Sequence, residues 1–119
     1  MNSTLATRIA AALGFLAVAL GAFGAHGLKH LLAQNNTADV WDKAVFYHFI
    51  HAVMLFVLAT QKPFQAVAWW GFFIGVFLFS GSLYVLAVTN ALWLGAVTPV
   101  GGVGFLLGWG WLVFKSVRG

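Results

Sequence analysis

The chain has 119 residues, of which 62% are hydrophobic and only 7% are charged, and its formal net charge is +4. A soluble domain carries roughly a quarter charged residues, so this composition excludes an ordinary soluble fold and places most side chains in lipid. The Lys and Arg residues lie near segment ends rather than in one patch, which indicates membrane orientation and argues against nucleic-acid binding.

The first apolar segment, about residues 5–27, is long enough to cross a bilayer as a helix. Ala22 and Gly24 are spaced like a signal-peptidase site, but the length of the apolar run favours an uncleaved first transmembrane helix. Gly14, Gly21 and Gly24 fall on one helix face together with alanines. Such a stripe of small residues predicts close packing against another helix.

Three further segments complete a single membrane domain over residues 1–119, an all-α, compact four-transmembrane-helix bundle. Residues 28–36 form a short amphipathic stretch that predicts an interfacial helix after the first span. The later spans are expected at about residues 40–60, 64–88 and 92–114. Glycines spaced for helix packing recur in the last two spans, at Gly71 and Gly75 and then at Gly101, Gly104 and Gly108.

Thr98-Pro99 leaves two alternatives for the last span. Thr98 could cap a helix that has Pro99 at its first position, or Pro99 could kink a helix that begins near Leu92.

Orientation follows from the distribution of positive charge over four spans. Arg8, Lys62, Lys115 and Arg118 fall at one end of the bundle, and Lys29 and Lys43 fall at the other. The excess of positive charge predicts that the first end, with both termini, is cytoplasmic.

The same topology brings polar side chains from all four segments into the outer half of the bundle. The inner half has almost no polar side chain apart from its terminal charges. Because polar groups in a membrane usually face one another or a wet cavity, we expect one outward-facing polar cleft. Its candidate residues are His26, Tyr47, His51, Ser80, Ser82, Tyr84 and Thr98.

The histidines allow several roles. Pairs three or four residues apart can bind zinc or copper through imidazole nitrogens, but no carboxylate apart from Asp42 lies nearby in the sequence. His26 and His51 are the weak metal candidates. The alternatives are structural hydrogen bonds that lock the bundle, or a ligand pocket or gate sensitive to protons. The sequence lacks cysteine, a Gly-x-Ser-x-Gly motif, a phosphate-cradling loop and a haem-attachment motif.

Motifs in all four segments carry a resemblance to a known family. They are Gly21-Ala22-Phe23-Gly24-Ala25-His26-Gly27-Leu28-Lys29, Ala44, Tyr47, His51-Ala52, Phe79-Ser80-Gly81-Ser82-Leu83-Tyr84, Thr98-Pro99-Val100-Gly101-Gly102 and Gly108-Trp109. The chain resembles domain-of-unknown-function family four-two-three, small bacterial inner-membrane proteins. The resemblance implies four transmembrane helices and no established activity. His30 and His48 are not part of the family pattern, which leaves His26 and His51 as the pair of interest.

Three functional hypotheses follow. The first is a non-enzymatic binding or accessory protein whose polar cleft holds a lipid headgroup or a small ligand, or docks a larger membrane complex. The second is a small transporter or channel, which would be a homo-oligomer because one four-helix bundle leaves little room for a pathway. The third is a metal-dependent membrane enzyme. The first needs no catalytic acid and no cofactor, and membrane lipid is its expected partner.

Overall fold

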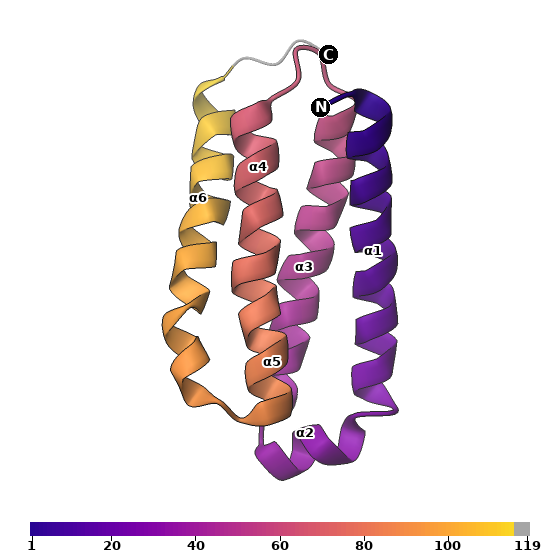
Figure 1. Cartoon of the computed structure of the whole chain (residues 1–119), viewed down its shortest axis with the longest axis vertical. Helices are drawn as coiled ribbons and strands as arrows, with labels where there is room; N and C mark the ends of the chain where they lie inside the picture. Colours follow the sequence, from indigo (N-terminus) through magenta and orange to yellow (C-terminus); the bar gives the residue numbers. More distant parts are fainter. Residues whose placement is uncertain (116–119) are drawn as a thin grey trace.

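The computed structural model describes residues 1–115, so Arg118 lies outside the described part of the chain. Within that part the chain is helical, and four helical segments are long and apolar enough to cross a membrane. They stand side by side as a bundle, and α1 begins at the end of the bundle where α6 finishes (Figure 1). The predicted all-α, four-span fold is therefore confirmed. The spans are Ser3–Ala25, Ala38–Ala59, Ala66–Thr89 and Leu92–Phe114.

The first span, α1 (Ser3–Ala25), packs along α3 (Ala38–Ala59) through small residues. Ala10, Ala17 and Gly24 are among its buried positions. A Cβ on Gly24 would overlap the indole ring of Trp41, so only glycine lets this ring lie against α1. Gly14 differs from the prediction: a Cβ there would meet nothing within 4 Å, because this position does not face α3 at close range.

Helix α2 (Lys29–Asn35) connects these two spans at the end of the bundle opposite the N-terminus (Figure 1). It ends because Asn36 adopts the left-handed conformation, with φ of 57°, which asparagine tolerates better than most residues. The Asn35 amide then donates to the carbonyls of Ala87 and Val88 at 3.0 and 3.1 Å. The short helix thereby supplies donors to the last turn of the third span, whose carbonyls have no partner within their own helix.

The third span is continuous but not uniform. Helix α4 (Ala66–Gly75) passes into a π-helical turn, η1 (Val76–Ser80), and then into α5 (Gly81–Thr89). It contacts the last span through glycines: a Cβ on Gly104 would lie 3.0 Å from the carbonyl oxygen of Gly71. The two backbones are therefore in direct contact, as small-residue stripes predict.

The last span begins with a 3-10 turn, η2 (Leu92–Ala96), and continues as α6 (Thr98–Phe114) with Pro99 in its first turn. The structure thus favours the alternative in which Pro99 starts the helix. The Thr98 hydroxyl does not cap it, however, since no side-chain hydrogen bond caps α6. Leu92 and Trp93 of η2 remain 73% and 71% exposed, so the 3-10 turn lies on the surface of the bundle.

Candidate functional site

His51 lies inside the bundle with both ring nitrogens bonded. Its Nδ1 is 2.7 Å from the carbonyl oxygen of Tyr47, and the indole Nε1–H of Trp109 donates to Nε2 over 3.0 Å. Since an indole N–H can only donate, Nε2 must be the unprotonated nitrogen and Nδ1 must carry the hydrogen. The ring also stacks on Phe105, with centroids 3.7 Å apart and planes 8° apart. His51 is therefore a neutral, fully bonded link between α3 and α6.

His48, one turn earlier on α3, is bonded through only one nitrogen. Its Nδ1 lies 2.8 Å from the hydroxyl of Tyr84 on α5, whereas Nε2 is buried without a hydrogen-bond partner. The backbone of Leu13 on α1 is near the ring, but no hydrogen bond of ordinary geometry joins it to Nε2. Whichever tautomer is present, one polar nitrogen is left unsatisfied in a side chain that is 2% exposed.

Aromatic packing connects the His48 pair to α1. The Tyr84 ring meets the Trp41 ring edge to face at 4.8 Å. The Trp41 indole in turn donates to the carbonyl of Leu20 over 3.0 Å. Gly24 makes room for this indole, so three spans are joined through one aromatic contact and two hydrogen bonds.

The hydroxyl groups of the predicted cleft are also bonded internally. Ser80 donates to the carbonyl of Ala44 over 2.8 Å and is fully buried. The hydroxyls of Ser82 and Thr98 lie 2.6 Å apart and join α5 to α6. Each hydroxyl also has a carbonyl acceptor, Phe79 for Ser82 and Leu94 for Thr98, so either one can donate to the other. These contacts hold helices together and leave little hydroxyl surface for a ligand.

His26 does not lie near His51 and the other candidate site residues. It follows the last residue of α1 and is exposed, at the end of the bundle where α2 lies. His51 sits thirteen residues into α3, which corresponds to roughly 20 Å along the helix axis. Among residues 1–115, no group of three or more His, Asp or Glu side chains is placed to hold a metal ion. The residues predicted as a metal pair therefore do not form one ligand set.

The end of the bundle where α1 begins contains polar contacts that the sequence interpretation missed. The Trp111 indole donates to the amide oxygen of Gln65 over 3.0 Å, and Gln65 is buried. Ser3 donates to the carbonyl of Ala59 over 2.8 Å. Gln65 lies within the third predicted span, 64–88, and is an exception to the expectation that this half of the bundle has almost no polar side chain.

A groove beside His51 opens on the outside of the bundle. It has a volume of about 340 Å³ and is lined by residues of α3, η1 and α6, among them Tyr47, Phe79, Val103 and Trp109. The Tyr47 ring is 37% exposed and contacts Phe79 at a centroid distance of 4.7 Å. Tyr47 bonds His51 through its backbone carbonyl, so that bond does not use its hydroxyl.

Comparison with known proteins finds a family of unknown function and relatives that are named membrane proteins. The family model described as protein of unknown function (DUF423) matches residues 20–102. The UPF0382 membrane protein YwdK of Bacillus subtilis is 45% identical over 109 residues, covering 87% of this chain and 88% of the relative. A UPF0382 membrane protein of Haemophilus influenzae is 37% identical over 109 residues, covering 88% of this chain and 87% of the relative.

A UPF0382 membrane protein of Staphylococcus epidermidis is 41% identical over 107 residues, covering 87% of each chain. No solved structure matches the chain. The family resemblance seen in the sequence motifs is thus confirmed, and none of these names states an activity.

Proposed function

Because this chain belongs to the DUF423 family of membrane proteins of unknown function, we propose its role from the geometry of its site: a non-enzymatic protein that binds a small membrane-dissolved ligand beside His51. One observation carries the proposal. His51 and the hydroxyls of Ser80, Ser82 and Thr98 are bonded to other side chains or to backbone, while an aromatic-lined groove next to His51 opens outward. The interior is a scaffold, and the groove is the place for a ligand.

The lining of the groove indicates the class of ligand. Its volume of about 340 Å³ falls in the range of small-molecule pockets. Aromatic rings on α3, η1 and α6 offer flat faces, and the Tyr47 hydroxyl offers one hydrogen bond. We expect a flat, largely apolar molecule that carries an oxygen able to bond Tyr47.

A short-chain benzoquinone is a suitable probe, since it has a flat ring and two carbonyl oxygens. Protein in lipid nanodiscs is titrated with the quinone, and quenching of tryptophan fluorescence reports binding near Trp109. Val103 is 53% exposed and lines the groove, so Val103→Trp should fill it and abolish quenching at low quinone concentration. Val100→Trp is the matched control, because Val100 is 58% exposed on the same helix and does not line the groove.

Tyr47→Phe tests the single polar contact. Loss of one hydrogen bond to a ligand should weaken binding by roughly five- to tenfold while the groove keeps its shape. Equal quenching in wild type, Val103→Trp and Tyr47→Phe would contradict the proposal.

The proposed location is the bacterial inner membrane with both termini cytoplasmic. Positive residues support this orientation: Arg8, Lys62 and Lys115 belong to the end where α1 begins and α6 finishes, against Lys29 and Lys43 at the α2 end (Figure 1). The groove beside His51 then opens near the middle of the bilayer, where a membrane-dissolved molecule can enter from the side.

A further inference from the structure

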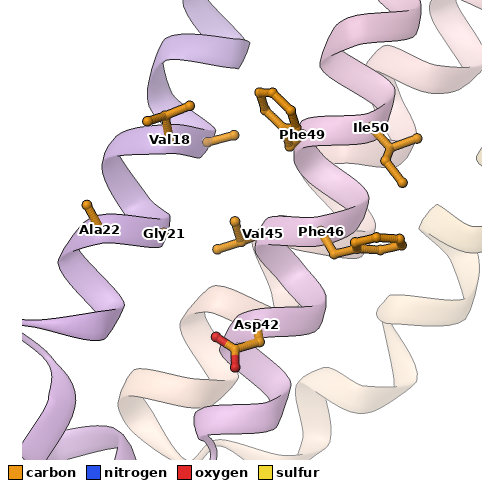
Figure 2. A pocket seen from close by; sticks show the side chains of 9 residues that line it. Val18, Gly21, Ala22, Asp42, Val45, Phe46, Phe49 and Ile50 are labelled. Carbon is orange, nitrogen blue, oxygen red and sulfur yellow. The ribbon is translucent and has the colours of Figure 1, made fainter.

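A second and larger groove runs between α1 and α3, away from His51. Its volume is about 630 Å³, and its walls come from Ala17 to Ala22 on one helix and from Asp42 to Ile50 on the other. Figure 2 shows the two helices side by side, with Val45 directed toward Gly21. The groove exists because α1 presents glycine, alanine and valine along this face and leaves space beside the larger rings of α3.

The walls of this groove are apolar and exposed. Val18 is 62% exposed on α1, and Phe46 and Phe49 are 59% and 43% exposed on α3. In a membrane-spanning bundle such side chains face the hydrocarbon core of the bilayer. From Asp42 to Ile50 the groove follows eight residues of helix, which is roughly 12 Å along the axis. A stretch of acyl chain lying parallel to the helices matches this shape.

Asp42 is the one ionisable residue in the lining. It lies near the beginning of α3, at the α2 end of the bundle, and its side chain is exposed. Its carboxylate points into the space between α3 and α1, at the end of the groove (Figure 2). Because α3 enters the bilayer here, the carboxylate lies at the level of the lipid headgroups while the rest of the groove lies at the level of the chains.

We propose that this groove binds a glycerophospholipid whose headgroup carries a primary ammonium, with an acyl chain along Val45 and Phe49 and the ammonium at Asp42. Charge complementarity selects this occupant. A carboxylate accepts a short, charge-assisted hydrogen bond from a primary ammonium. A quaternary choline headgroup has no N–H to donate and loses that bond, so phosphatidylethanolamine is favoured over phosphatidylcholine.

The test is competition between two lipids with identical acyl chains. Purified protein is incubated in mixed micelles with equal amounts of phosphatidylethanolamine and phosphatidylcholine, and native mass spectrometry counts the lipid that each protein molecule retains. Wild type should retain one phosphatidylethanolamine with a preference of roughly tenfold, as one charge-assisted hydrogen bond provides. Asp42→Asn should reduce this preference to nearly none.

Asp39→Asn is the matched control, since Asp39 is an exposed acid in the first turn of the same helix and does not line the groove. It should leave the preference unchanged. The proposal is overturned if wild type retains the two lipids equally, if the preference survives Asp42→Asn, or if Asp39→Asn removes it as well.

A second pair of variants tests the apolar part. Ala22 is exposed and lines the groove, so Ala22→Trp should fill it and release the lipid, whereas Ala19→Trp, at an exposed position outside the lining, should not. A dimer that forms in wild type and is disrupted by Ala22→Trp would instead assign the groove to a second copy and overturn the lipid proposal. The Val103→Trp variant leaves this site intact, so failure here is distinguishable from failure of the His51 groove.

Discussion

His48 and His51 lie one turn apart on α3 and differ in how completely their rings are bonded. His51 uses both nitrogens, whereas His48 keeps one buried nitrogen without a partner. A buried polar group without a partner costs more than the net gain of a typical hydrogen bond. The His48–Tyr84 hydrogen bond therefore offsets part of the cost of burying the His48 ring. Removing this bond should lower the free energy of unfolding.

Tyr84→Phe should lower the free energy of unfolding by about 1 kcal/mol, because it leaves both nitrogens of His48 unpaired. Adding His48→Leu to this variant should recover most of the loss, since no buried polar atom then remains at the pair. The measurement is denaturation in mixed micelles for the two single variants and the double variant. If the losses of the single variants simply add, the two side chains do not interact.

The sequence predicts which polar residues lie inside the bundle better than it predicts the hydrogen-bond partner of each one. The sequence placed His51, Ser82 and Thr98 among the polar residues inside the bundle. Ser82 and Thr98 bond each other, whereas His51 bonds the Tyr47 carbonyl and the Trp109 indole. His48 was set aside because the family pattern does not include it, although it lies on the same buried face of α3 as Ala44 and His51. Trp109 entered the sequence interpretation as part of the motif Gly108-Trp109, and the packing of α6 against α3 shows it as a donor.

At the scale of elements, direct backbone contact between the third and fourth spans is the main packing feature. A Cβ on Gly101 would overlap the backbone nitrogen of Phe79, which cannot move aside as a flexible side chain could. Gly75 faces the ring of Phe105 in the same interface. The interface therefore tolerates no added methyl group at its centre.

Gly101→Ala should destabilise the protein by about 2 kcal/mol or more, because the helices must separate to accommodate the methyl group. Gly110→Ala is the matched control on the same helix, since a Cβ there meets nothing within 4 Å. It should leave stability unchanged or raise it by up to about 1 kcal/mol through helix propensity. Thermal unfolding in detergent compares the two, and equal stabilities would show that the contact does not limit packing.

Element bounds were predictable where local chemistry sets them, and less so elsewhere. Asn36 marks the end of α2 because asparagine tolerates the left-handed conformation, whereas the sequence left two alternatives for Pro99, which lies in the first turn of α6. The π-helical turn at Val76–Ser80 was not foreseen. Its residues are apolar or small and suit an α-helix equally well, so contacts with neighbouring helices decide the hydrogen-bonding pattern.

At the scale of the whole molecule, the orientation in the bilayer is open to a direct experiment. The chain has no cysteine. A single introduced cysteine therefore reports on which side of the membrane it lies, with no labelling of native cysteines. His30 on α2 and Lys62 in the loop between α3 and α4 are both exposed and belong to opposite ends of the bundle. In intact spheroplasts a membrane-impermeant maleimide should label His30→Cys, and it should label Lys62→Cys only after permeabilisation. The reverse pattern would contradict cytoplasmic termini.

The π-helical turn affects how many residues the third span needs to bring its second half into position. A π turn closes its hydrogen bonds one residue later than an α turn, so it takes up residues without advancing the face that follows. If the turn between Val76 and Ser80 became α-helical with no residue removed, the part of the span beyond it would rotate by about 100°. Ser82 and Tyr84 would then turn away from Thr98 and His48, which bond them now. Removing one residue together with that change would cancel the rotation, so the π turn holds one residue more than an α-helix would need to present Ser82 and Tyr84 to the same neighbours.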